Sequence, residues 1–246
     1  MTQAKICGLT TPDALGAALA GGAAFVGAVV YPKSPRHIDP LHGATLFERA
    51  RGRAGIVAVT VDADDALLTE IASLRPDAVA CFFAGGGAAK FIRDYAAAGL
   101  KDKIPLWGSG FLTEGVLDAA GPAADGIMTT MHYSDSLDTP KNKAWRTAYA
   151  TGFKMQPDVY AVQGYDTGLL LSQGMAAVKG DMSNKPALYK ALETQTIDSP
   201  RGKWKMSPSH NPIQDIYLRQ VTGGENKVIG VAAKQLADPG TGCKMG

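Results

Sequence analysis

Short apolar runs alternate with helical patterns along the first 132 residues, and Gly, Pro or Asp residues separate one from the next. This order is typical of repeated βα units, in which a helix follows each strand and returns the chain to the start of the next one. The apolar runs are continuous rather than alternating, which favours parallel strands that helices cover on both faces. The strands that we expect are residues 5–8, 25–31, 56–62, 77–83, 104–108 and 126–132.

The helices between and after these strands carry recognisable start signals. Thr11 precedes Pro12 and is a plausible N-cap, and Asp62 or Asp64 could cap the third helix. After residue 132 the helices become longer, and the turn at residues 223–226 indicates a β-hairpin. The expected elements are helices at residues 12–20, 41–51, 63–74, 88–98, 114–119, 139–152, 159–178 and 185–194, and further strands at 202–206, 213–221 and 227–233.

These patterns predict the α/β class, with a mostly parallel, doubly wound sheet and a helical and β-hairpin appendage. The chain has 246 residues, of which 46% are hydrophobic, so it can bury a core. The 25 Lys and Arg residues nearly balance the 23 Asp and Glu residues, and no basic run carries interleaved aromatic residues. We therefore expect no nucleic-acid partner.

The three cysteines, Cys7, Cys81 and Cys243, have no CxxC or metal-ligand spacing, which argues against a metal site and favours a reducing compartment. The N-terminus has no basic segment followed by an apolar run and a cleavage site, as a signal peptide would. No stretch reaches the roughly 18 apolar residues of a membrane span. As written, the chain is expected to be cytoplasmic and without a membrane partner.

Two motifs near the N-terminus are specific enough to identify a relative: Lys5-Ile6-Cys7-Gly8-Leu9-Thr10, and Tyr31-Pro32-Lys33-Ser34-Pro35-Arg36. They resemble the first half of phosphoribosylanthranilate isomerase, a (β/α)₈ barrel of tryptophan biosynthesis. The resemblance implies that Cys7 is the general base of an Amadori rearrangement and that Arg36 holds the anthranilate carboxylate. The structural alternatives are a small buried cysteine and a solvated arginine.

The resemblance stops inside the strand expected at residues 77–83. Where the isomerase family continues into Gln-Leu-His-Gly, this chain has Ala80-Cys81-Phe82-Phe83, and the later barrel strands with the acidic partner and the phosphate loops do not follow. A general base without an acid and a phosphate anchor stabilises a transition state poorly. Asp62 or Asp135 could supply the acid. The glycine run at residues 84–87 could cradle a phosphate, and a tight turn into a helix explains it equally well.

The rest of the chain carries a second, longer set of motifs: residues 82–86, 99–101, 105–113, 158–166, 198–202 and 210–215. In this order they resemble type I periplasmic binding proteins of ABC transporters, in the branch for Leu, Ile, Val or aromatic acids. That family holds a small ligand at the carboxyl ends of parallel strands. The resemblance implies ligand contacts from Ala84, Gly85, Ser109, Gly110, Phe111, Tyr160, Gln163 and Tyr165. A turn cap at Ser109 and helix packing by Tyr160 and Tyr165 are the structural alternatives.

The two resemblances meet near residue 80 and indicate a chimera, engineered or natural. We expect an isomerase-like fragment at residues 1–79, binding-protein-like βα units at 80–135 that complete the same flavodoxin-like sheet, and a helical and hairpin part at 136–246. The first lobe of the binding-protein family does not precede residue 80, so the later helices need another partner, which could be a second copy of the chain.

Three functions remain open after this comparison of motifs. The first is a non-catalytic protein that needs no cofactor and keeps weak binding of a small aromatic carboxylate or amino acid. The second is a working isomerase with Cys7 as base. The third, a transport receptor, is disfavoured by the missing lobe and the absent export signal.

Overall fold

The structure, a computed structural model, describes residues 3–243 except for the side chain of Asp65. The chain divides into two compact units, and it passes between them within β6, near the end of β9 and at the start of β10. The first unit contains residues up to Thr129 together with Gln220–Glu225, and the second contains Thr130–Arg219 and the residues from Asn226 onward. Each unit is described by itself below.

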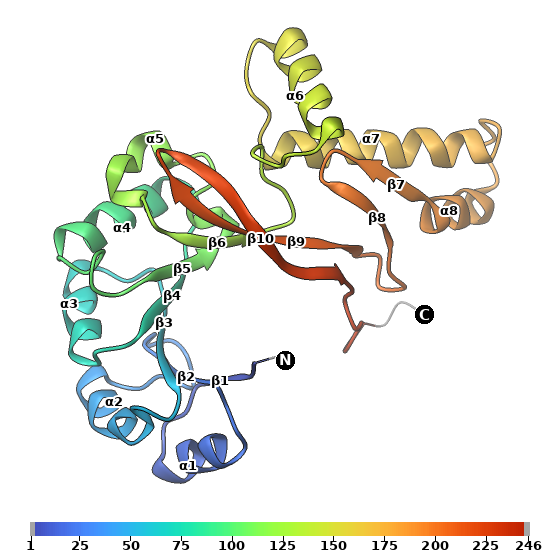
Figure 1. Cartoon of the computed structure of the whole chain (residues 1–246). Helices are drawn as coiled ribbons and strands as arrows, with labels where there is room; N and C mark the ends of the chain where they lie inside the picture. Colours follow the sequence, from blue (N-terminus) through green and yellow to red (C-terminus); the bar gives the residue numbers. More distant parts are fainter. Residues whose placement is uncertain (1–2, 244–246) are drawn as a thin grey trace. The chain divides into compact units, whose positions relative to one another are not determined.

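The first unit is a parallel sheet of βα units (Figure 1). Its strands follow one another across the sheet in chain order, β1 to β6, and the end of β9 continues it. The strands are β1 (Lys5–Cys7), β2 (Phe25–Val29), β3 (Gly55–Val61), β4 (Ala78–Phe82), β5 (Leu106–Ser109) and β6 (Met128–Met131). The helices are α1 (Pro12–Ala20), α2 (Pro40–Phe47), α3 (Asp65–Ser73), α4 (Gly86–Ala97) and α5 (Leu117–Ala120), with short 3-10 turns η1 (Glu48–Ala50), η2 (Gly110–Leu112) and η3 (Gly121–Ala124).

Local capping fixes where these helices begin. The Thr11 hydroxyl accepts the N–H of Ala14 at 3.2 Å, and Pro12 occupies the first helical position, as predicted. Of the two aspartates considered for α3, Asp64 is the cap: its carboxylate accepts the N–H of Leu67 at 2.9 Å. Asp62 instead adopts a left-handed conformation, with φ of 53°, just after β3.

The mostly parallel α/β sheet agrees with the prediction, but in the first unit its winding differs from the expectation of helices on both faces. Consecutive strands are neighbours, and right-handed crossovers then place the connecting helices on one face. Figure 1 shows α1 to α4 along one side of the strands. On that side the core is fully packed, with Val26, Ile56 and Val79 each 0% exposed. On the opposite face Phe25, Phe82 and Trp107 are 37%, 52% and 37% exposed. The continuous apolar strands therefore reflect a buried face and an open apolar face.

The second unit contains three helices and an antiparallel sheet. The helices are α6 (Pro140–Phe153), α7 (Val159–Ala177) and α8 (Lys185–Thr194), and the strands are β7 (Thr196–Ser199), β8 (Gly202–Met206), β9 (Pro212–Thr222) and β10 (Glu225–Leu236). Strand β8 pairs antiparallel with both β7 and β9. Strand β7 was not predicted, since four residues after a helix give almost no periodic signal.

The predicted hairpin joins β9 to β10. Gly223 and Gly224 have φ of 60° and 77°, so both central residues of the turn are left-handed, as a type I′ turn requires. Helix α8 has no buried residue, and apolar side chains on α7 and α8, such as Leu171 and Tyr189, are exposed. This agrees with the expectation that the later helices present apolar faces.

Candidate functional site at the strand ends

The predicted site residues fall in both units. Seven of them, Cys7, Arg36, Ala84, Gly85, Ser109, Gly110 and Phe111, belong to the first unit and lie at or just after the carboxyl ends of its parallel strands. The other three, Tyr160, Gln163 and Tyr165, lie on α7 of the second unit. Within the first unit the seven residues form two separate groups.

The first group lies at the end of β1 and contains Cys7 and Arg36. Its side chains pack closely over glycines: a Cβ on Gly27 would lie 2.6 Å from the Cys7 sulfur, and a Cβ on Gly8 would lie 2.6 Å from Cδ of Arg36. The backbone N–H of Arg36 donates to the Ser34 hydroxyl at 3.1 Å, which ties the loop that carries it. The fold thus places both isomerase-like residues at the end of β1.

The second group lies where β4 and β5 end. Gly85, with φ of 64°, turns the chain into α4, and no side chain caps that helix. The backbone N–H groups of its first turn therefore face the strand end without a side-chain acceptor. The hydroxyl oxygen of Ser109, at the end of the neighbouring β5, is buried and has no hydrogen-bond partner in the described part of the chain. We call Ala84, Gly85, Ser109, Gly110, Phe111 and the first turn of α4 the strand-end site.

The two groups are too far apart to hold one small ligand. Strands β1 and β4 are three steps apart in the sheet, and each step is about 4.8 Å, so roughly 14 Å separates their ends. Asp62, one of the two candidate acids, follows β3 and is two strand steps from Cys7, roughly 10 Å. The sequence did not reveal this spacing, because it depends on the order of the strands.

On α7, Tyr160 and Gln163 are three residues apart and share a face of the helix. Tyr165 instead packs against Trp145, with ring centroids 5.7 Å apart, so the packing alternative describes its position. The side-chain amide of Gln163 lies 3.2 Å from Nε2 of His132. Burial, together with the charges of Arg201 and Arg219, lowers the pKa of His132 to about 4.

Next to this face lies a buried polar cluster that the analysis of motifs did not single out. Nε of Arg201 donates to Oδ2 of Asp166 at 2.6 Å, and the indole N–H of Trp204 donates to the same oxygen at 2.8 Å. The Arg201 guanidinium also lies over the Trp204 ring, 5.1 Å from its centroid. Asp166 and Arg201 both occur in the motifs of the second resemblance, which was the signal available for them.

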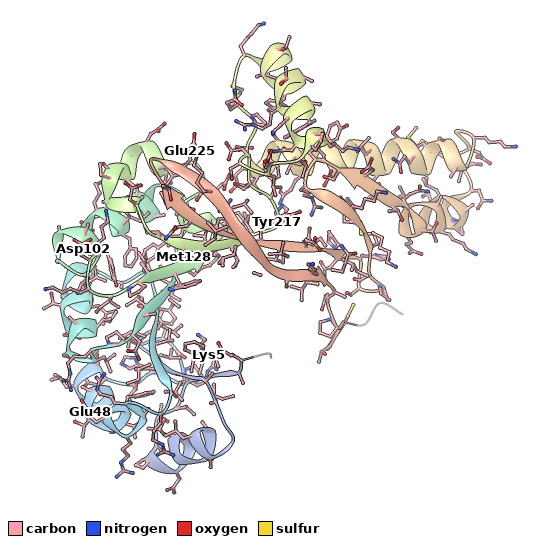
Figure 2. All side chains as sticks on the ribbon, in the orientation of Figure 1. Lys5, Glu48, Asp102, Met128, Tyr217 and Glu225 are labelled. Carbon is pink, nitrogen blue, oxygen red and sulfur yellow. The ribbon has the colours of Figure 1, made fainter. Side chains whose placement is uncertain are left out.

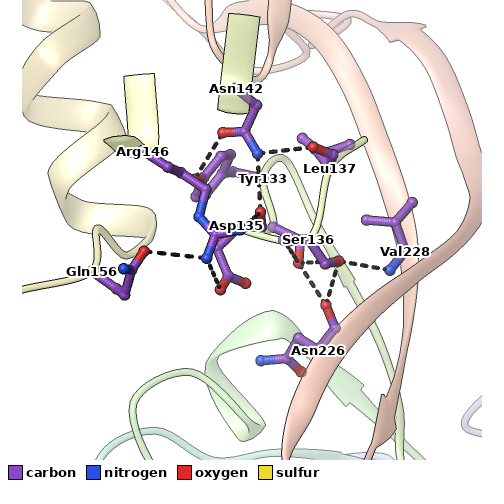
Figure 3. Close-up of polar contacts among 10 residues, drawn as sticks. Tyr133, Asp135, Ser136, Leu137, Asn142, Arg146, Gln156, Asn226 and Val228 are labelled. Carbon is purple, nitrogen blue, oxygen red and sulfur yellow. Dashed lines mark hydrogen bonds and ion pairs between the residues drawn. The ribbon is translucent and has the colours of Figure 1, made fainter. Parts of the chain in front are cut away.

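The second candidate acid, Asp135, belongs to a loop that its neighbours hold in place (Figure 3). The backbone carbonyl of Asp135 accepts hydrogen bonds at 3.0 Å from the Asn142 amide and from Nη1 of Arg146. Its carboxylate lies 3.7 Å from Nη2 of Arg146. Ser136 fastens the same loop to β10, because its hydroxyl donates to the carbonyl of Asn226 and accepts the N–H of Val228. The arrangement is structural and orders the start of α6.

Within residues 3–243, no three His, Cys, Asp or Glu side chains come together as a metal site would need. None of the helices in this range combines the length and apolar character of a membrane span.

Residues 47–226 match the family described as "Periplasmic binding protein". Over 74 residues the chain is 60% identical to N-(5'-phosphoribosyl)anthranilate isomerase of Brucella canis. This aligned segment makes up 30% of this chain and 33% of that protein. The chain is thus similar to the isomerase over 74 residues and to periplasmic binding proteins over residues 47–226, and these are the two families that the motifs predicted.

Solved structures extend the second likeness. One is a solute-binding protein of an ABC transporter from R. palustris in complex with benzoate, which is 42% identical to this chain with a TM-score of 0.71. The alignment covers 96% of this chain and 65% of that protein's chain. Another, from Rhodopseudomonas palustris BisB5 in complex with 3,4-dihydroxybenzoic acid, is 26% identical with a TM-score of 0.68. The alignment covers 91% of this chain and 64% of that protein's chain. This chain therefore spans about a third of the isomerase and slightly less than two thirds of these binding proteins.

Proposed function

Because the chain belongs to the periplasmic binding protein family, we propose that it binds a small aromatic carboxylate at the strand-end site of its first unit. The observations that carry this proposal are the buried, unpartnered hydroxyl of Ser109 at the end of β5 and the uncapped first turn of α4, which follows the neighbouring strand β4. Benzoate and 3,4-dihydroxybenzoic acid in the complexes of two relatives support the class of ligand.

The chemistry of the strand-end site suits a carboxylate. A helix N-terminus offers N–H groups and a partial positive charge to an anion. The Ser109 hydroxyl supplies one further donor, and in the absence of a ligand its burial leaves a hydrogen bond unmade. Phe111, partly buried after Ser109, is near enough in sequence to offer an apolar surface to the ring.

Calorimetric titration with benzoate, 4-hydroxybenzoate, anthranilate and leucine tests the proposal, and Gly86 provides a matched pair of variants. Gly86 is the first residue of α4, where proline fits a helix and removes one N–H, whereas alanine keeps it and meets no atom within 4 Å. We expect Gly86→Pro and Ser109→Ala each to weaken benzoate binding roughly tenfold or more, as the loss of a hydrogen bond to a charged group does. Gly86→Ala should bind as the parent does. Heat signals absent for every ligand, or equal affinities for Gly86→Pro and Gly86→Ala, would refute the proposal.

A second candidate function is isomerisation by Cys7, which is favoured by the position of Arg36 over Gly8, the residue that follows Cys7. We propose that this group does not turn over substrate, because the likeness covers only 33% of the isomerase, and a general base without its acid and phosphate anchor stabilises a transition state poorly. Complementation of a tryptophan auxotroph is the test. If the soluble protein restores growth of the auxotroph and its Cys7→Ala variant does not, the chain is an isomerase instead.

We also propose that the chain is a recombined one, joined within β4. The support is that the isomerase likeness covers only 74 residues, while β4 pairs in register with both β3 and β5, so a join inside this strand keeps the ladder intact. Sequencing of transcripts across the codons of β4 tests it. An insertion or frameshift there would show that the two parts are not one reading frame.

Two further properties of the protein are proposals. The three free cysteines support a reducing, cytoplasmic location, which fractionation of cells that express the chain would test. The exposed apolar side chains on α7 and α8 support a homodimer. Sedimentation velocity over a range of concentrations measures it, and a monomer at every concentration would exclude it.

A further inference from the structure

The second unit contains a cavity among α7, α8, β8 and the turn that follows β8. Its volume is about 380 Å³, which lies within the range of about 300–1,000 Å³ of small-molecule sites. Figure 2 draws the side chains of these elements as sticks. All the lining residues belong to the second unit, whereas the strand-end site belongs to the first. The lining consists of Leu170, Tyr189, Leu192, Glu193, Met206 and His210.

Close packing of α7 with α8 and β8 forms the apolar floor of this cavity. A Cβ on Gly174 would lie 2.4 Å from the Leu192 side chain, so the two helices approach closely there. Leu170 lies one turn before Gly174 on the same face of α7. The indole N–H of Trp204 on β8 donates to this face too, and Met206 is two residues further along the same side of β8. Three partly buried apolar side chains, from α7, α8 and β8, therefore converge on one space.

Glu193 and His210 form the polar end of the cavity. Nε2 of His210 lies 3.0 Å from Oε1 of Glu193, and the imidazole is the donor because a carboxylate only accepts. The backbone of His210 is left-handed, with φ of 58°, and its N–H donates to the Ser207 carbonyl at 2.9 Å. The turn thus holds the imidazole against one carboxylate oxygen. Within residues 3–243 the other oxygen, Oε2, accepts no hydrogen bond and is available to a ligand.

The charge that this polar end offers a ligand is negative. A neutral imidazole can donate through Nε2, so the bond from His210 leaves the Glu193 carboxylate its charge. The lysines nearest to the lining residues in the chain, Lys190 and Lys205, do not line the cavity. Neither of them forms an ion pair with Glu193 in the described part of the chain. Lys205 precedes Met206 on β8 and therefore points to the opposite face of that strand.

We propose that this cavity is a binding site for a small organic cation, a protonated amine that carries one apolar ring. Its ammonium group would donate to Oε2 of Glu193, and its ring would lie on Leu170 and Met206. Tyr189, one helical turn before Glu193 and 57% exposed, stands at the mouth of the cavity, close enough for its ring to contact the same cation. The ligand class follows from a charged acceptor at the end of an apolar floor, and it differs from the aromatic anions proposed for the strand-end site.

Titration calorimetry at pH 8 with 2-phenylethylamine, and with 2-phenylethanol as its uncharged match, tests this proposal. At this pH imidazoles are ordinarily neutral, while a primary amine is still protonated. Glu193→Gln should lower the affinity for the amine about tenfold, as the loss of a charged hydrogen bond does, and leave the affinity for the alcohol unchanged. Glu70→Gln, which changes an exposed glutamate of the first unit, should alter neither affinity.

The aromatic side of the cavity is tested with a second pair of variants. Tyr189→Leu should lower the affinity for the amine about three- to fivefold, since it removes the ring that contacts the cation. Phe153→Leu, which changes an exposed aromatic residue at the end of α6, should not. Both positions are more than half exposed, so these variants should keep the parent's circular dichroism. Gly86→Pro, which acts on the strand-end site, should leave amine binding intact, so the two sites can fail separately.

Three results would overturn the proposal: no heat of binding with the amine, equal affinities for the amine and the alcohol, or an amine affinity that Glu193→Gln does not change. A protein that sediments as a dimer and becomes monomeric in Tyr189→Leu would also overturn it, because a second copy would then cover the cavity.

Discussion

Arg201 and Asp166 form a buried ion pair in the second unit: Nε of Arg201 lies 2.6 Å from the carboxylate, and the two side chains are only 5% and 3% exposed. Trp204 donates to the same carboxylate, so removal of Asp166 leaves both a cation and an indole N–H without their acceptor. We expect Asp166→Ala to lower the free energy of unfolding by about 3–5 kcal/mol, as the loss of one partner of a buried pair does.

Asp198 provides the matched control for this prediction. It pairs with Lys141 at the surface, where its side chain is 61% exposed. Asp198→Ala should change the free energy of unfolding by less than about 1 kcal/mol. Urea denaturation of both variants is the measurement. Equal effects would mean that burial does not decide the strength of these pairs.

The depressed pKa of His132 predicts a loss of stability in mild acid. Its folded pKa, about 4, lies below the ordinary value of about 6.5, so the unfolded chain binds the proton more readily. The contribution of neutral His132 to the free energy of unfolding is complete above pH 6.5. It declines by an amount on the order of 3 kcal/mol as the pH falls towards 4. The measurement is urea denaturation at intervals between pH 7 and pH 4.

A His132→Gln variant separates this effect from the titration of other groups. It has no titratable group at this position, so its stability should fall less steeply than the parent's over the same pH range. Parallel curves for parent and variant would mean that His132 is not responsible.

Two glycines on α7 should respond to alanine in opposite directions. A Cβ on Gly174 would lie 2.4 Å from a methyl carbon of Leu192 on α8, whereas a Cβ on Gly168 meets nothing within 4 Å. Gly174→Ala should destabilise by about 1–3 kcal/mol through overpacking. Gly168→Ala should stabilise by about 0.5–1 kcal/mol, because alanine favours the helix.

Thermal unfolding monitored by circular dichroism measures both changes. Leu192→Ala in the Gly174→Ala background should recover part of the loss by making room for the new methyl group. No recovery would indicate that the two helices do not pack as described.

The three cysteines should react with a thiol reagent in an order set by their burial. Burial raises the pKa of Cys81 to about 12, so its thiol stays protonated at pH 8 and unreactive. Cys243 is exposed and Cys7 is partly buried. Iodoacetamide labelling followed by mass spectrometry should find Cys243 modified first, Cys7 later, and Cys81 only after denaturation. Labelling of Cys81 in the native protein would contradict the packing of α4 on β4.

Much of the fold could be predicted because its signals are local. The N-cap at Thr11 and the turn at Gly223-Gly224 are set by residues within a few positions, and the structure contains both as expected. The motifs also identified both families correctly. The short strand β7 was missed, and the choice between Asp62 and Asp64 as a cap stayed open, since neighbouring aspartates give the same signal.

The candidate site was predictable as a set of residues but not as an arrangement. Both loop groups do lie at the carboxyl ends of parallel strands, yet strand order separates Cys7 and Arg36 from the strand-end site by roughly 14 Å. The pair of Asp166 and Arg201, 35 residues apart, could not be predicted from spacing, because only the packing of α7 beside the β7–β8 hairpin joins them.

The sequence by itself determined the alternation of strands and helices, their caps and turns, and the two families that the chain resembles, because each depends on residues close together in the chain. Only the tertiary structure decided that the helices of the first unit cover one face of its sheet and leave the other open and apolar. The physical reason is that apolar strands look alike whether one face or both are covered, while the winding depends on which strands become neighbours.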